Sequence, residues 1–136
     1  MGVNLPRFFT LAGSISAFLA VAAGAFGAHA LKRQLTPESL AIFETGARYQ
    51  MYHAIALFPC AWLAMQGWRL APPAGWLFIA GTVLFSGSLY LIALTGISRF
   101  GLITPFGGVA FLGGWLCLIL CAWPGRPTPG SESQDS

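Results

Sequence analysis

The stretch that decides the fold is LAPPAGWLFIAGTVLFSGSLYLIALTGIS, residues 70–98, which carries no charged residue. A helix of about 20 apolar residues crosses the ~30 Å hydrocarbon core of a bilayer, so this stretch is long enough to span a membrane. Three further charge-free runs qualify in the same way, at residues 8–31, 49–68 and 100–125. The sequence therefore predicts an all-α membrane protein, a bundle of four transmembrane helices.

The composition excludes an ordinary soluble domain. Hydrophobic residues make up 56% of the 136 residues and charged residues 8%, whereas soluble domains carry roughly 25% charged residues. The lysine and arginine residues, which give the chain a net charge of +3, flank the apolar runs. Basic residues at such positions contact lipid head groups. We expect membrane lipids as partners and no nucleic acid, because the basic residues are not clustered. We expect one four-span domain over residues 1–123 and a disordered polar tail over residues 124–136.

Four spans place both termini on the same side of the membrane. The positive-inside rule does not decide which side, because the faces are nearly balanced. The face with the termini has Arg7, Arg69 and Arg126, and the opposite face has Lys32, Arg33, Arg48 and Arg99. The first apolar run also looks like a secretion signal, but it exceeds the ~7–15 apolar residues of such signals. We expect a true membrane helix there.

A short additional helix is expected between the first and second spans. Thr36 is a suitable N-cap, Pro37 suits the first helical position, and Glu38 favours the positive end of a helix. Because polar and apolar side chains alternate in the following turns, this segment is expected to lie on the membrane interface. We expect it to bend at Gly46 into the second span.

Small residues recur three or four positions apart along the predicted spans. Such residues let two helix backbones approach closely in lipid. The candidates for helix packing are Gly13, Ala17, Ala20, Gly24, Gly27, Gly87, Ala110 and Gly114. Three cysteines, Cys60, Cys117 and Cys121, lie inside apolar runs and are interpreted as packing residues.

Polar residues collect in the half of the bundle opposite the termini. Glu44 and Arg48 are spaced for an ion pair, with the acid first, and ionisable groups at membrane depth pair or line a cavity. The candidate cluster, structural or ligand-binding, comprises His29, Glu44, Arg48, Tyr49, Tyr52, His53, Ser86, Ser88 and Tyr90. Two histidines underspecify a metal site, since zinc takes three or four protein ligands. We expect no metal, no haem or other cofactor, and no catalytic residue.

Four motifs in order resemble one known family. They are GAFGAHAL at 24–31, FETGARYQMYHA at 43–54, FSGSLY at 85–90 and ITPFGG at 103–108. Together they resemble domain-of-unknown-function family 423, small bacterial inner-membrane proteins related to a eukaryotic transmembrane protein family. The resemblance covers roughly residues 8–123. It implies a multi-pass protein of the bacterial inner (cytoplasmic) membrane without an established activity, and it assigns no role to any residue.

Three functions follow from these observations. The first is a non-enzymatic bundle that packs with itself, as a homo-oligomer, or serves as an accessory subunit of a larger membrane complex. The second is a binding or transport module for a lipid, a quinone or a small solute, centred on Arg48, Tyr52 and His53. The third is a membrane enzyme that uses His53 as a general base. We favour the first.

Overall fold

The structure is a computed structural model that describes residues 2, 4–124 and 129. Its main helices are α1 (Leu5–His29), α2 (Pro37–Met65), α3 (Ala71–Gly81), α4 (Gly87–Thr95) and α5 (Thr104–Ala122). Short helical segments connect them: η1 (Leu31–Arg33), the π-helical η2 (Thr82–Ser86) and η3 (Ser98–Leu102). Because η2 joins α3 to α4 without a break, the described chain forms four helical rods and contains no strand. The all-α, four-helix prediction is confirmed.

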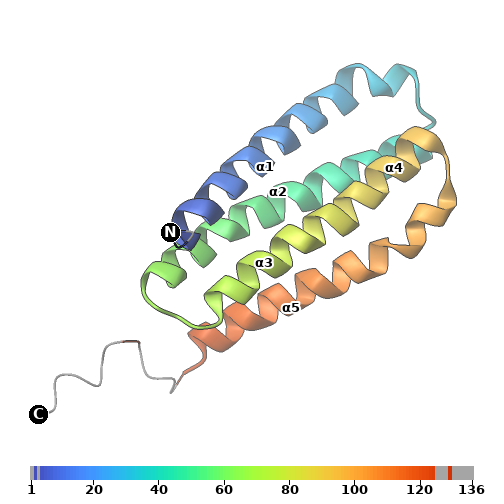
Figure 1. The fold of residues 1–136 in the computed structure, drawn as a ribbon. Helices are drawn as coiled ribbons and strands as arrows, with labels where there is room; N and C mark the ends of the chain where they lie inside the picture. The colour runs from blue at the N-terminus through green and yellow to red at the C-terminus, as the bar shows by residue number, and fades with distance from the viewer. Residues whose placement is uncertain (1, 3, 125–128, 130–136) are drawn as a thin grey trace, which may run out of the picture.

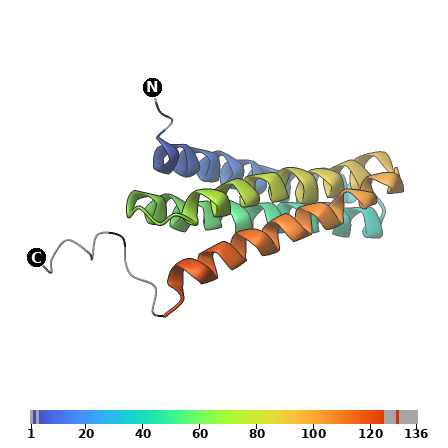
Figure 2. The same ribbon diagram turned by 60° about the horizontal axis from the view of Figure 1, so that its bottom comes forward.

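The four rods run antiparallel to their neighbours in the sequence (Figure 1). The beginning of α1 and the end of α5 lie at the same end of the bundle, which we call the terminal end. α2 contacts α1, α3, η2 and α4, whereas α5 contacts α3 and η2. α1 and α5 are therefore the outer helices, on opposite sides of the central pair formed by α2 and α3–η2–α4 (Figure 2).

Three helical segments are long and apolar enough to cross a membrane: Leu5–Arg33, Ala71–Thr95 and Ser98–Ala122. α2 does not reach the same hydropathy, and it packs against α1, α3, η2 and α4. Its polar residues Gln50 and His53 are 8% and 4% exposed, respectively. A helix that other helices cover can carry polar groups in lipid, because those groups find partners inside the protein.

The expected separate helix before the second span is corrected by the structure. Thr36 does cap a helix, since its Oγ1 accepts a hydrogen bond from the Ser39 N–H at 3.2 Å. That helix, however, is α2 itself, which continues without interruption to Met65. A Cβ at Gly46 would lie 3.0 Å from the Tyr90 ring, so Gly46 provides a close contact with α4 instead of a bend.

The other predicted helix limits are close to those observed. α1 begins at Leu5 instead of near residue 8, because the Asn4 side chain accepts a hydrogen bond from the Arg7 N–H at 3.1 Å and caps the helix. The charge-free runs at 70–98 and 100–125 contain the observed rod α3–η2–α4, residues 71–95, and the observed α5, residues 104–122. Most of the predicted tail, residues 125–128 and 130–136, lies outside the described residues.

Glycines set the close approaches between the helices. A Cβ at Gly13 would lie 2.8 Å from the Ala54 carbonyl oxygen, and one at Gly114 would lie 2.5 Å from the Phe78 ring. A Cβ at Gly27 would lie 3.2 Å from the Phe43 ring. Among the other predicted packing residues, Ala20 is buried, and Ala17, Gly87 and Ala110 are half-buried. At Gly24 and Gly87 a Cβ would meet nothing within 4 Å, so these two glycines do not join helices of this chain.

Candidate functional site

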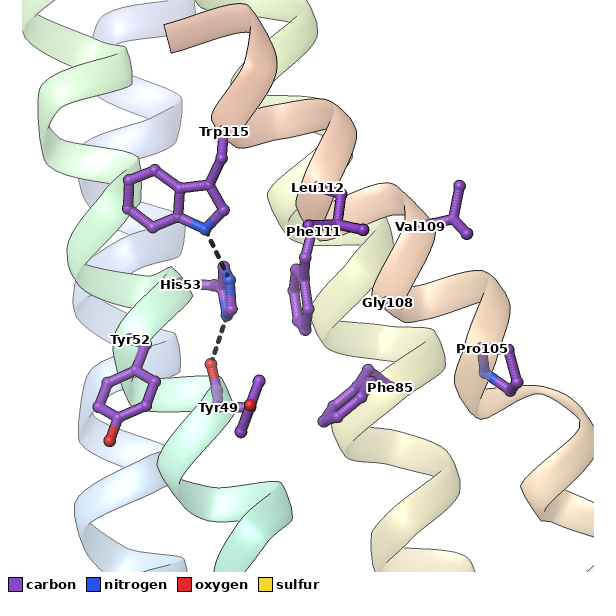
Figure 3. Close-up of a pocket in the computed structure, with 10 residues that line it drawn as sticks. All are labelled: Tyr49, Tyr52, His53, Phe85, Pro105, Gly108, Val109, Phe111, Leu112 and Trp115. Atoms are coloured by element: carbon purple, nitrogen blue, oxygen red, sulfur yellow. Dashed lines mark hydrogen bonds between the residues drawn. The ribbon is translucent and has the colours of Figure 1, made fainter. Parts of the chain in front are cut away.

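A groove lies between α2 and α5, with Phe85 of η2 also lining it (Figure 3). We call it the α2–α5 groove. Its volume is about 620 Å³. Aromatic and aliphatic side chains form most of its surface, and its lining residues are Tyr49, Tyr52, His53, Phe85, Pro105, Gly108, Val109, Phe111, Leu112 and Trp115. The groove exists because α5 packs closely on α3 and η2 and not on α2.

His53 stands at the centre of the groove wall, stacked on Phe111 with the ring centroids 3.4 Å apart and the planes within 3°. The Trp115 Nε1–H donates a hydrogen bond to His53 Nε2 at 3.1 Å. Since indole nitrogen can only donate, Nε2 must accept, and the ring proton of a neutral imidazole is then on Nδ1. Nδ1 lies 2.7 Å from the Tyr49 carbonyl oxygen, to which it donates. Both ring nitrogens of His53 therefore have partners within the chain (Figure 3).

Gln50 connects three helices on the other side of α2. Its Nε2 donates to the Ser16 carbonyl oxygen of α1 at 3.1 Å, and its Oε1 accepts from the Tyr90 hydroxyl of α4 at 2.7 Å. Gln50 is not among the candidate residues predicted from the sequence. The available signal was an amide inside an otherwise apolar run, since such a group in lipid usually bonds to a neighbouring helix.

Ser86 and Ser88 differ in whether their hydroxyl groups form hydrogen bonds. The Ser88 hydroxyl donates to the Phe85 carbonyl oxygen at 2.9 Å and lies 2.7 Å from the Thr104 hydroxyl. Because the only Ser88 hydroxyl proton is used by Phe85, the Thr104 hydroxyl is the donor in the second bond. This bond ties α4 to the first turn of α5. The Ser86 hydroxyl is buried and has no hydrogen-bond partner among the described residues.

The remaining members of the predicted cluster lie on the surface. His29, Glu44 and Arg48 are exposed, and so is Tyr52, at 51%. The expected ion pair between Glu44 and Arg48 is not formed in the described chain. His29 is also not among the rings that contact His53, which are those of Tyr49, Phe78, Phe111 and Trp115. The structure thus brings Tyr49, Tyr52 and His53 together along the groove, and Ser86, Ser88 and Tyr90 lie between helices.

The described residues contain no group of three or more His, Cys, Asp or Glu side chains that could hold a metal ion. Cys60 is fully buried within the largest apolar cluster, together with Phe9, Phe78 and Phe111. His53 would have to break a hydrogen bond before it could bind a metal or accept a proton. The arrangement is therefore suited to enclosing an apolar or aromatic group in the groove, with the polar atoms beneath it already paired.

Comparison with known proteins agrees with the motifs. The family model described as "Protein of unknown function (DUF423)" matches residues 23–108. The chain is 48% identical over 118 residues to the UPF0382 membrane protein YwdK of Bacillus subtilis (strain 168), covering 85% of this chain and 96% of that protein.

The UPF0382 inner membrane protein YgdD of Escherichia coli (strain K12) is 42% identical over 119 residues, covering 85% of this chain and 89% of that protein. No solved structure matches the chain. The resemblance drawn from the four motifs is thereby confirmed: the chain belongs to the DUF423 family of membrane proteins, whose function is unknown.

Proposed function

We propose that this chain is a non-enzymatic bundle of the inner membrane that acts by packing with itself or as an accessory subunit of a larger membrane complex. The observation that carries the proposal is that the buried polar side chains of α2 form hydrogen bonds to neighbouring helices. His53 bonds to Trp115, and Gln50 bonds to Tyr90 and to α1. These groups hold helices together and leave His53 without a free nitrogen to act as a base. The proposal therefore sets the enzyme hypothesis aside.

In this proposal all four helical rods cross the membrane, with both termini on one side. α2 has 29 residues, about 43 Å at about 1.5 Å per residue, which exceeds the ~30 Å hydrocarbon core. The first turns of α2, with exposed Glu38 and Glu44, would then extend to the interface. A second apolar cluster of Leu31, Phe43 and Ala93 supports a packed end of the bundle at that level.

The outer surface of α1 is the face proposed for packing with a partner. Gly24 is exposed, and a Cβ there would meet nothing within 4 Å. A glycine on an outward helix face lets a second helix approach closely in lipid. Gly24 differs in this respect from Gly13 and Gly27, which are buried against α2.

The test is extraction of the full chain from native membranes in several gentle detergents. Light scattering would give the mass of the particle, and mass spectrometry would identify co-purifying proteins. We expect a homo-oligomer or a stoichiometric complex, and Gly24→Leu should dissociate it. Gly108→Leu is the matched control, because Gly108 also faces open space but on α5. A strictly monomeric species without a stoichiometric partner in every detergent would refute the proposal.

A second function, binding of an amphipathic molecule, is favoured by the α2–α5 groove. A volume of about 620 Å³ is within the ~300–1,000 Å³ typical of small-molecule sites, and its lining is largely aromatic. Native mass spectrometry of the gently purified protein would test this function. A spectrum without any bound lipid, quinone or solute would count against it.

A further inference from the structure

The α2–α5 groove has the length of one membrane leaflet. On α5 its lining runs from Pro105 to Trp115, a rise of about 15 Å at about 1.5 Å per residue. This is half of the ~30 Å hydrocarbon thickness of a bilayer. The groove begins beside the first turn of α5, at the level where the Ser88–Thr104 bond joins α4 to α5. The first turn of α5 lies at the end of the bundle opposite the terminal end (Figure 1), so the groove runs inward from that half.

A positive charge lies beside the groove-lining residues of α2. Arg48 immediately precedes Tyr49 and lies one helical turn before Tyr52, and both tyrosines line the groove. Residues spaced i and i+4 are neighbours on a helix surface, so Arg48 lies beside Tyr52, next to the lining and not within it. Arg48 is exposed, and among the described residues its guanidinium group forms no ion pair. It can therefore bind an anion from outside the chain.

We infer that the groove binds an anionic phospholipid, with one acyl chain along Tyr49, Phe85 and Phe111 and the phosphate at Arg48. This inference rests on the second function proposed above and names its ligand and site. The arginine favours a head group with a net negative charge. Guanidinium binds phosphate with paired hydrogen bonds, but in a zwitterionic phospholipid the cationic group of the head offsets the charge of that phosphate, and an uncharged head group has no anion to offer. An uncharged quinone head would leave Arg48 without a role.

The shape of the groove suits an acyl chain. Its volume of about 620 Å³ extends along about 15 Å of α5, and its lining is largely aromatic and aliphatic, so an extended hydrocarbon chain can lie along it. A second copy of the chain that covers the groove is the alternative occupant, and the experiment distinguishes the two.

The experiment is native mass spectrometry of the full-length protein titrated with phosphatidylglycerol or phosphatidylcholine of the same acyl chains. We expect wild-type protein to bind one phosphatidylglycerol at least about fivefold more tightly than phosphatidylcholine, as one basic residue near an anionic lipid predicts. Arg48→Gln should abolish this preference. Arg99→Gln, which changes an exposed cation on η3, should retain it.

A groove-filling variant tests the position of the acyl chain. At Gly108 a Cβ would meet nothing within 4 Å, so Gly108→Leu should fill the groove without disturbing the packing of α5. We expect it to weaken phosphatidylglycerol binding at least tenfold, whereas Gly87→Leu on α4, where a Cβ also meets nothing within 4 Å and which does not line the groove, should leave the binding unchanged. Thermal unfolding of each variant checks that the fold is intact, and Arg48→Gln provides a surface variant if Gly108→Leu fails to fold.

Three outcomes would overturn the inference. These are equal wild-type affinity for the two lipids, equal lipid binding by the two leucine variants, and a change of particle mass caused by Gly108→Leu. The last would make the groove a protein interface. The effect of Gly24→Leu on particle mass tests the packing proposal separately, so either proposal can fail without the other.

Discussion

The contact between α5 and η2 permits a sharp test of the packing, through the substitution Gly107→Ala. A Cβ at Gly107 would lie 2.7 Å from the Phe85 Cβ and 2.8 Å from the Phe85 Cα, and it would also meet the Phe85 backbone nitrogen. Carbon atoms at optimal separation are about 3.5–4.0 Å apart. α5 would therefore have to move away from η2 by about 1 Å, since a backbone cannot rotate aside as a side chain can.

The expected cost follows from two opposing contributions. Overpacking a tight contact costs about 1–3 kcal/mol, and alanine is about 1 kcal/mol more favourable than glycine inside a helix. The adjacent substitution Gly108→Ala isolates the first contribution, because its Cβ meets nothing within 4 Å. We expect the free energy of unfolding of Gly107→Ala to be about 1–3 kcal/mol below that of Gly108→Ala, since the helix-propensity gain is common to both variants.

The assay is reversible unfolding in mixed micelles of a mild detergent and sodium dodecyl sulfate, followed by circular dichroism. Both variants and the wild-type chain are compared at the same lipid and detergent content. Gly108→Ala should be at least as stable as the wild type. Equal stability of the two variants, or a more stable Gly107→Ala, would refute the close approach of α5 to η2.

Three further substitutions address the buried polar groups. Tyr90→Phe should lower the free energy of unfolding by about 1 kcal/mol, because it removes the donor to Gln50 Oε1 and leaves that atom unpaired. Trp115→Phe should lower it by about 0.6–2 kcal/mol, the range for hydrogen bonds between membrane helices, because it removes the donor to His53. Ser86→Ala should leave it unchanged or raise it by up to about 1 kcal/mol, because the Ser86 hydroxyl is buried without a partner. The same detergent titration measures all three.

The tyrosine and serine substitutions each have a control in the chain. Tyr52→Phe changes an exposed tyrosine and should not alter stability, so an equal loss in both tyrosine variants would contradict the role of the Tyr90 hydroxyl. Ser88→Ala removes a hydroxyl bonded to Phe85 and Thr104 and should destabilise the chain. A greater loss for Ser86→Ala than for Ser88→Ala would show that the Ser86 hydroxyl has a partner. Retained stability in Trp115→Phe would show that the His53 bond contributes nothing.

Much of the fold was predictable from local signals. The absence of charge over long stretches identifies helices that can cross a membrane, because a bilayer accepts only segments whose backbone bonds are satisfied internally. Thr36 and Pro37 correctly mark the beginning of α2. The bend at Gly46 was wrong, because a glycine inside a helix has the same local signature whether it bends the helix or accepts a neighbouring ring. Only the Tyr90 ring packed against Gly46 distinguishes the two.

The candidate site was predictable in composition but not in connectivity. Tyr49, Tyr52 and His53 are separated by helical spacings, so the sequence alone places them on one side of α2. Gln50 lies among them yet points to α1 and α4, and the partner of His53 is Trp115, far along the chain on α5. A sequence does not state which helices are neighbours, and that choice determines every bond between them.

The amino-acid sequence by itself determined that this chain is a membrane protein of four helical rods and a member of its family, because hydropathy and motifs are local properties of a chain. The tertiary structure alone decided that α2 is enclosed, that α5 leaves it partly uncovered, and that a groove results. The physical reason is that these features depend on which backbones approach closely. Those approaches arise where glycines on different helices, such as Gly81 and Gly107, meet aromatic residues of the facing rod.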